Sequence, residues 1–403
     1  SRGLGDVYKR QSDHLIIFIN KNMSSYNKNL VFTAACIGMC FFGISMITLG
    51  SVLPSLTTKL GLDNLQATAL VTFLPLGLLG GSLLFGPIVD RFGHKALLLL
   101  SCLVVLLGLE GIAFFTSIPL LQLSIIGIGL GGGILNGETN ALVADISDEA
   151  EKGSRLSLLG AFYGIGALGI PVLLSFLSGY YSFEIILQGT GVVMLAGILF
   201  CLGVRFPAPK QPQGFPIKEG LGLLKESSLL LLSFILFFQS GIEGVCNNWT
   251  TLYLGQTTNI PENRALMALT CMVAGLTVAR LLLVVLFKKI KQETVLRASL
   301  ITAAIGFALL TFSPDFARAA IGMVLVGAGL ASTFPVILSI VGSRYASLSG
   351  TAFSVALVIA LIGQTLLNSL TGIISQGYSI VVYPYMMIAS LLIMLLLFKR
   401  SLK

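Results

Sequence analysis

Charged residues are scarce in this sequence. Only 10% of its 403 residues are Asp, Glu, Lys or Arg, while 55% are hydrophobic and the mean hydropathy is +0.94. A water-soluble domain carries about 25% charged residues. A chain this poor in charge cannot cover a surface that faces water, so most of its surface must face lipid. The composition therefore excludes a soluble globular protein and indicates a membrane protein.

Residue types that perform catalysis or bind metals are also few. The chain has two histidines, His14 and His94, and its six cysteines show no metal-binding spacing. It contains no Ser/His/Asp arrangement and no HExxH motif. We therefore expect no enzyme, no metal site and no cofactor.

Long apolar runs are abundant. A helix crosses the hydrocarbon core with about 20 apolar residues, because it satisfies its own backbone polar groups there. The sequence predicts an all-α membrane protein with twelve transmembrane helices, at 30–53, 66–89, 96–117, 118–144, 155–179, 182–204, 228–254, 264–287, 294–313, 316–341, 350–376 and 379–398.

The longest polar interruption divides these helices into two groups of six. It covers 205–227 and is rich in proline, which resists helix continuation. We predict an N-terminal bundle at 23–204, a cytoplasmic linker at 205–227 and a C-terminal bundle at 228–403. The polar loop after 66–89 aligns with the loop after 264–287, which indicates two pseudo-symmetric six-helix bundles.

Residues 1–22 do not fit this plan. Residues 6–11 have the sequence that a common library adapter encodes in frame. We interpret 1–22 as a non-native leader and exclude it from the fold. We expect the protein's own sequence to start at Met23.

The basic residues are placed as membrane topology requires. The net charge is +8, but the loops on the side opposite the N-terminus hold only Lys59, Arg264 and Arg318 among the basic residues. Basic residues accumulate in cytoplasmic loops, so both termini are predicted to be cytoplasmic in a multi-pass protein of the inner (plasma) membrane. The excess of positive charge therefore indicates topology, and we expect a lipid bilayer but no nucleic acid as partner.

The strongest local motif lies between the second and third helices. It comprises Gly86, Asp90, Arg91, Gly93 and Lys95. Gly93 permits a tight turn, and Gly86 lets another helix approach closely. Asp90 ends its own helix, where the dipole repels a negative charge, so it needs a positive partner elsewhere.

This motif resembles the loop signature of the major facilitator superfamily. The resemblance implies that Asp90 contacts the N-terminus of the helix at 350–376, that a basic residue of the motif braces it, and that the contact closes the cytoplasmic side. His94 occupies a position where the family usually has Arg or Lys, which weakens one donor. The resemblance also implies that helices 1, 4, 7 and 10 line a central cavity.

Ionisable residues deep in the bilayer are candidates for function, because each costs several kcal/mol unless it is paired or hydrated. Glu138, Glu243 and Arg280 are the main candidates for proton coupling or buried charge. We expect Arg280 to pair with Glu243, or failing that with Glu138. Glu110 lies on a helix that the resemblance places at the periphery, where we expect a packed or snorkelling side chain.

Polar side chains four residues apart share one face of a helix. Such a stripe runs along the seventh helix, and two further pairs lie on the fourth and eleventh helices. Amides both donate and accept, which suits a hydroxyl-rich ligand. We predict substrate-binding residues at Asn136, Asn140, Gln239, Glu243, Asn247, Asn248, Trp249, Gln364 and Asn368. Because Glu138 points about 160° away from the two asparagines of its helix, we expect it at the flank or paired to another helix.

Several segments together resemble the fucose and glucose/galactose permease branch of the superfamily. They are 136–143, 156–169, 241–253, 279–280, 334–335 and 349–353. The resemblance implies sugar transport coupled to protons, with an acid in helix 1 and an acid at the position of Asn136. Helix 1 has no acid here, so Glu243 or Glu138 must carry any coupling.

We predict a secondary active transporter of a small polar solute, a sugar, that works by alternating access, as a monomer and with H+ as a candidate partner. A drug or metabolite efflux antiporter is one alternative, although the glycines before Pro171 are one residue out of step with the element that the resemblance associates with antiporters. A non-transporting membrane sensor is the other.

Overall fold

The computed structural model describes residues 26–401, apart from 63, 212–216, 259, 261 and 313–314. No strand occurs among these residues, and twelve of their helical spans are long and apolar enough to cross a membrane. The predicted fold class is confirmed. The leader predicted at 1–22 lies outside the described residues.

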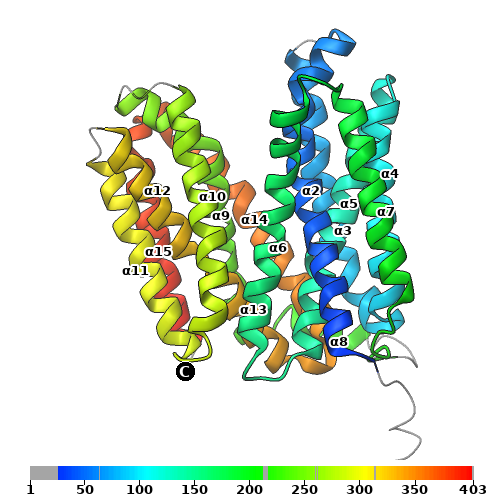
Figure 1. Ribbon diagram of the computed structural model, residues 1–403. Helices are drawn as coiled ribbons and strands as arrows, with labels where there is room; N and C mark the ends of the chain where they lie inside the picture. Colours follow the sequence, from blue (N-terminus) through cyan, green and yellow to red (C-terminus); the bar gives the residue numbers. More distant parts are fainter. Residues whose placement is uncertain are drawn as a thin grey trace, which may run out of the picture.

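The first six of the twelve membrane spans form one bundle and the other six form a second (Figure 1). The first bundle consists of α2 (Lys28–Leu60), α3 (Asn64–Phe92), α4 (His94–Phe114), α5 (Ile118–Ile146), α6 (Lys152–Leu177) and α7 (Phe183–Gly203). The second consists of α9 (Ser227–Thr257), α10 (Glu262–Leu286), α11 (Gln292–Thr311), α12 (Phe316–Leu330) with α13 (Thr333–Arg344), which together make one span, α14 (Ser349–Gly377) and α15 (Tyr383–Ser401).

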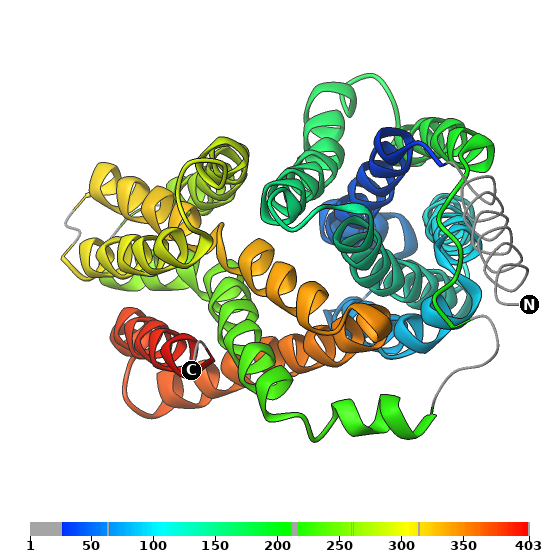
Figure 2. The same ribbon diagram turned by 90° about the horizontal axis from the view of Figure 1, so that it is seen from below.

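The chain between the bundles contains a short helix that the sequence did not predict. This helix is α8 (Ile217–Leu223), and it lies inside the linker predicted at 205–227. Seen from below in Figure 2, the segment around α8 runs along one end of both bundles. We call this the linker end.

The tenth membrane span is interrupted. The sequence predicted one helix at 316–341, but α12 ends at Leu330 and α13 begins at Thr333. Pro335 has no N–H to donate to the carbonyl of Ala331, so the regular helical hydrogen bond cannot form there. Two 3-10 turns, η1 (Ala346–Leu348) and η2 (Ile380–Val382), precede α14 and α15.

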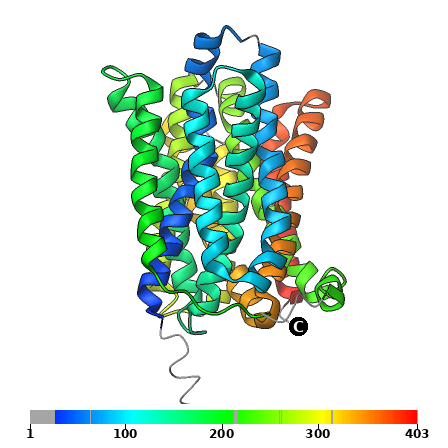
Figure 3. The ribbon, with the colours of Figure 1, turned by 90° about the vertical axis from the view of Figure 1, so that its right-hand side faces the viewer.

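The two bundles are close together at the linker end and diverge toward the other end (Figure 1). In the view of Figure 3 the helices run roughly side by side along one common direction, as membrane-spanning helices must. Helix α14 packs along α9 of its own bundle and also reaches α3 and α5 of the first bundle. The arrangement therefore places the contacts between the bundles mainly at one end.

Close packing within the first bundle depends on glycine in α6. A Cβ atom at Gly166 would lie 2.0 Å from the carbonyl oxygen of Cys40 on α2, whereas a Cβ atom at Gly169 would have no neighbour within 4 Å. Lipid provides no hydrophobic drive between helices, so such backbone contacts supply much of the packing energy.

The variants Gly166→Ala and Gly169→Ala form a matched pair. Gly166→Ala must push α2 and α6 apart, so it should destabilise the detergent-solubilised protein by about 1–3 kcal/mol. Gly169→Ala should be neutral or slightly stabilising, because alanine favours helix over glycine by up to about 1 kcal/mol. Thermal unfolding followed by intrinsic fluorescence measures both, and equal melting temperatures would contradict the close approach.

Candidate gating and substrate sites

Asp90 joins the two bundles. Its carboxylate, in the last turn of α3, accepts hydrogen bonds from the backbone N–H groups of Gly350 at 3.1 Å and Thr351 at 2.9 Å, and from the Thr351 hydroxyl at 2.7 Å. These groups belong to the first turn of α14, where free N–H groups and the helix dipole attract an anion. The structure places this residue of the motif against the helix terminus that the resemblance implies.

Two glycines of the motif shape this contact. A Cβ atom at Gly86 would lie 2.6 Å from the carbonyl oxygen of Gly350 and 2.8 Å from the Cα atom of Thr351. Any side chain at Gly86 would therefore force α14 away from α3. Gly93 has a φ of +82° and forms the junction between α3 and α4, a conformation that suits glycine.

The basic residues of the motif do not brace Asp90, which corrects the expectation from the sequence. The exposed Arg91 lies over the ring of Phe92 at 5.0 Å, and the Lys95 ammonium donates to the carbonyl of Leu202 at 2.8 Å. Both side chains therefore make their contacts away from Asp90. The linker residue Lys210 is the cation that attracts Asp90 instead.

Lys210 also connects the two bundles. Its ammonium donates to the Asp145 carboxylate on α5 at 2.7 Å, to the carbonyl of Ala346 in η1 at 2.6 Å and to the Ser349 hydroxyl at 2.5 Å. The Ser349 hydroxyl in turn donates to Asp145 at 2.8 Å. Sequence analysis missed this role, because nothing in the sequence distinguishes Lys210 from the other lysines of the linker, Lys218 and Lys225.

His94 lies between two carboxylates of α5. Its Nδ1 atom is 3.2 Å from Oε1 of Glu138, and its Nε2 atom is 3.2 Å from Oδ2 of Asp145. Glu138 is fully buried and is paired to another helix, and its second oxygen has no hydrogen-bond partner among the described residues. The sequence treated His94 as a weakened donor, whereas the structure surrounds it with acids.

A second seam between the bundles runs along α6 and α10. The Ser157 hydroxyl donates to the carbonyl of Arg280 at 2.7 Å, and the Ser154 hydroxyl donates to the carbonyl of Val284. The Arg280 guanidinium donates back to the carbonyl of Gly160 at 2.9 Å. Small residues at successive turns of α6 thus bring the two backbones close together.

Arg280 does not form the ion pair expected from the sequence. Within the described part of the chain, no salt bridge connects it to Glu243, and Glu138 pairs with His94 instead. The side chain of Arg280 extends across to α6, where Gly160 has no side chain to cover its carbonyl. Glu243 nevertheless lies within electrostatic range of Arg280 and of Tyr163.

Tyr163 belongs to the same central region but was not singled out in the sequence. It lies three residues beyond Gly160 on α6 and packs against Phe42 of α2, with ring centroids 5.2 Å apart. Helices α2, α6, α9 and α10 therefore bring aromatic, acidic and basic groups together between the bundles. In the sequence, its spacing of three residues from Gly160 indicates that Tyr163 lies near the same face of α6 as the small residues.

The polar residues along α9 differ in how far they are exposed. Gln239 is fully buried and donates to the carbonyl of Leu330, at the break between α12 and α13, at 3.1 Å. Glu243 is half-buried, whereas Asn247 and Asn248 are exposed. Gln239 is thus enclosed by protein in this conformation, and only the part of the stripe farther from the linker end is open.

The other predicted amides form local networks. Asn140 donates to the carbonyl of Asn136 at 2.7 Å, within α5. Asn248 donates to Oδ1 of Asn368 on α14 at 2.9 Å, and Asn368 donates to the carbonyl of Gln364 at 2.7 Å. The indole of Trp249 packs beside Gly372, close to this second network. The structure therefore connects α9 with α14 but leaves the asparagines of α5 as a separate pair.

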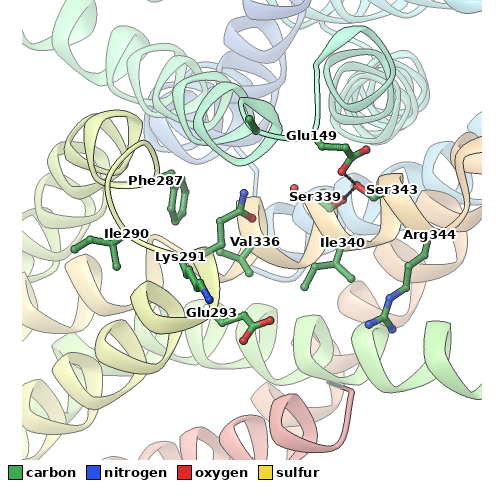
Figure 4. Close-up of a pocket in the computed structure, with 12 residues that line it drawn as sticks. Glu149, Phe287, Ile290, Lys291, Glu293, Val336, Ser339, Ile340, Ser343 and Arg344 are labelled. Atoms are coloured by element: carbon green, nitrogen blue, oxygen red, sulfur yellow. Dashed lines mark hydrogen bonds between the residues drawn. The ribbon is translucent and has the colours of Figure 1, made fainter. Parts of the chain in front are cut away.

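A pocket of about 470 Å³ lies between the bundles at the linker end (Figure 4). Glu149 and Ser343 line it. Lys152 donates to Glu149 at 2.6 Å and to Ser343 at 2.9 Å, while Ser343 donates to Glu149 at 2.5 Å. The hydrogen bonds from Lys152 and Ser343 hold the pKa of Glu149 below its ordinary value. This network connects α13 to the chain before α6 and adds to the closure of the linker end.

The variant Asp90→Asn tests the closure. The amide cannot accept as a charged carboxylate does, and its NH2 group faces helix N–H donors, so about 2 kcal/mol of stabilisation of the closed linker end should be lost. Maleimide labelling of Ser339→Cys, on the pocket wall, should then become faster. The exposed acid Asp148, which pairs with Lys28, provides the control variant Asp148→Asn. Equal labelling rates in both variants would contradict the role of Asp90.

Known proteins share this sequence pattern and this architecture. The family model described as Major Facilitator Superfamily matches residues 35–364. The inner membrane transport protein YdiN of Escherichia coli (strain K12) is 27% identical over 189 residues, which cover 46% of this chain and 44% of YdiN. The match thus spans less than half of that relative.

Two further proteins match over greater lengths. The glucose/mannose transporter GlcP of Bacillus subtilis (strain 168) is 25% identical over 374 residues, which cover 84% of this chain and 89% of GlcP. The crystal structure of the Escherichia coli fucose:proton symporter FucP aligns with a TM-score of 0.77 at 17% identity, over 92% of this chain and 98% of FucP. At that identity the structure supports the fold alone. Since the family model matches most of the chain, this protein belongs to the Major Facilitator Superfamily.

Proposed function

We propose that this protein is a secondary active transporter that moves a small polar solute, a sugar, across an inner (plasma) membrane by alternating access. The observation that carries the proposal is the uneven contact between the bundles. Hydrogen bonds that Asp90 accepts and that Lys152, Ser157 and Lys210 donate join the bundles toward the linker end. The helices diverge at the other end (Figure 1).

Such contacts can break and form again. They pair carboxylates, hydroxyls and ammonium groups with backbone groups, and water can replace each partner at little net cost when the interface opens. We propose that the bundles at 23–204 and 228–403 move as units about the linker at 205–227. The conformation described is the one that is closed at the linker end.

The orientation follows from charge. The linker end carries basic residues of both bundles, among them Lys95, Arg155, Lys210, Lys289 and Arg344. By the positive-inside rule this end faces the cytoplasm, and both termini lie there. The conformation is then open toward the outside, and we propose that the protein works as a monomer and catalyses no chemical reaction.

A polar solute fits the side chains between the bundles. Glu243, Arg280 and Tyr163 come from three helices of the two bundles, and Asn247 and Asn248 lie exposed further along α9. A carboxylate, a phenol and amides can satisfy several hydroxyl groups at once. The names of the similar proteins GlcP and FucP, a glucose/mannose transporter and a fucose:proton symporter, support sugars as the substrate class.

Uptake into proteoliposomes tests the substrate class. A panel of radiolabelled hexoses, pentoses, amino acids and cationic dyes should show saturable uptake of at least one sugar. That uptake should increase when the outside is more acidic than the lumen, if H+ is the coupling ion. If the protein transports the dyes but no sugar, the proposed sugar transporter is wrong and a drug efflux antiporter is indicated. If it transports none of the compounds, a non-transporting membrane sensor is indicated.

The variant Glu243→Gln tests the substrate site. A hydrogen bond from a hydroxyl to a charged group is worth about 1.5–3 kcal/mol, so initial uptake below saturation should fall about 10-fold or more. Folding should remain intact, because Glu243 is only half-buried and forms no ion pair within the described residues. Glu110→Gln is the matched control, because Glu110 lies on α4 with its carboxylate beside Gly191 of α7, within the first bundle. Equal uptake by the two variants would contradict the assignment of Glu243 to the substrate site.

A further inference from the structure

Three titratable side chains lie together in the first bundle, behind the closed linker end. We infer that His94, Glu138 and Asp145 bind one exchangeable proton, which stabilises the closed linker end and is released to water on that side when the end opens. The inference rests on the proposed alternation of the bundles. It assigns the proton to a cluster that lies outside the substrate site.

The geometry places an acid at each nitrogen of one imidazole. Nδ1 of His94 is 3.2 Å from Oε1 of Glu138, and Nε2 is 3.2 Å from Oδ2 of Asp145. The side chain of His94 is 7% exposed, that of Glu138 is 0% exposed and that of Asp145 is 11% exposed. Water therefore has little access to the cluster in the closed conformation.

Counting protons shows that the closed cluster must hold an additional one. A neutral imidazole donates from one nitrogen only, and an ionised carboxylate can only accept. With both acids ionised and the imidazole neutral, one of the two contacts would place a lone pair against a lone pair. Both contacts become hydrogen bonds when one further proton is present, either on the imidazole or on a carboxyl group.

Charge balance leads to the same count. With the additional proton the three groups carry a net charge of −1, and the Lys210 ammonium, 2.7 Å from Oδ1 of Asp145, neutralises it. Without that proton a net negative charge would remain buried, and Oε2 of Glu138 has no partner within the described residues. An uncompensated buried charge is costly, so loss of the proton must destabilise the closed arrangement.

The remaining titratable groups near the cluster do not replace this proton. Asp90, on α3, lies within the field of Lys210 but is satisfied by the N-terminus of α14. The thiols of Cys102 on α4 and Cys201 on α7 lie within electrostatic range of Glu138 and are neutral in their ordinary form.

The cluster is connected directly to the other bundle. Oδ1 of Asp145 accepts from the Ser349 hydroxyl at 2.8 Å, and Lys210 holds both Ser349 and the carbonyl of Ala346. When the linker end opens, Ser349 and Ala346 must move away with the second bundle. Asp145 then becomes accessible to water, which solvates the ionised acids and accepts the proton.

The sign of the pH dependence follows. Protonation favours the closed linker end, so raising the pH should open it. Spin labels at Ala150→Cys and Ile290→Cys, on opposite sides of the linker-end pocket, report the separation of the bundles. In the full-length protein in lipid nanodiscs, the population with the longer inter-label distance should grow as the pH rises and shrink again on acidification.

Substitutions in the doubly spin-labelled protein test which of the titratable groups are responsible for the pH response. In Glu138→Gln, the amide can donate to Nδ1 of His94 without releasing a proton, so the pH response should be lost and the short distance retained. If that variant does not fold, His94→Gln serves instead and should also lose the response. Glu110→Gln, whose acid lies on the same helix as His94 but outside the cluster, should keep it.

Two results would overturn the inference. One is an inter-label distance that does not change with pH in the protein without cluster substitutions, and the other is an unaltered pH response in Glu138→Gln or His94→Gln. Asp90→Asn should lengthen the distance at every pH. If it does not, the proposed alternation fails, and this outcome is distinct from failure of the proton site.

Discussion

The contact between the Asp90 carboxylate and the first turn of α14 is the interaction on which the arrangement of the bundles depends. Two helix ends act on this carboxylate. The C-terminal end of α3 destabilises its negative charge, and the N–H groups at the N-terminal end of α14 stabilise it. Gly86 allows the close approach, and the Ser354 hydroxyl extends the seam by donating to the carbonyl of Ser82 at 2.5 Å. The charged side chain of Asp90, which its own helix destabilises, therefore joins the two bundles through hydrogen bonds.

The same physical logic governs the seam between α6 and α10. There Ser157 and Gly160 meet the backbone and guanidinium of Arg280, so the contact consists of hydrogen bonds and short side chains rather than interlocked apolar residues. Two apolar surfaces that interlock would be costly to separate, whereas polar seams can exchange their partners for water. Buried apolar residues fill the interior of both bundles. The polar seams between the bundles suit repeated opening.

Each buried charge in this membrane protein has a particular way of being tolerated. Arg280 crosses to the other bundle and meets a carbonyl, Asp90 meets a helix terminus, and His94 shares two acids with Lys210 nearby. Polar groups in a bilayer must find such partners, because lipid offers none. The partners of Arg280 and Asp90 belong to the other bundle, and Lys210 beside the His94 cluster also contacts that bundle, so movement of one bundle alters the environment of charges in the other. The proposed substrate site and the proposed proton site would be coupled through this movement, without direct contact between them.

The sequence by itself determined the number of membrane helices, the division into two bundles and the importance of Asp90, Gly86 and Gly93. These follow from local properties, since hydrophobic length, proline-rich interruption and helix-end electrostatics act within a few residues of the chain. Only the tertiary structure decided which partners the charges take. Arg280 donates to the carbonyl of Gly160 and forms no ion pair with Glu243 within the described residues. Lys210 takes the place expected for the basic residues of the motif. His94 contacts both Glu138 and Asp145. Those choices depend on the rotation and approach of helices that are far apart in the chain.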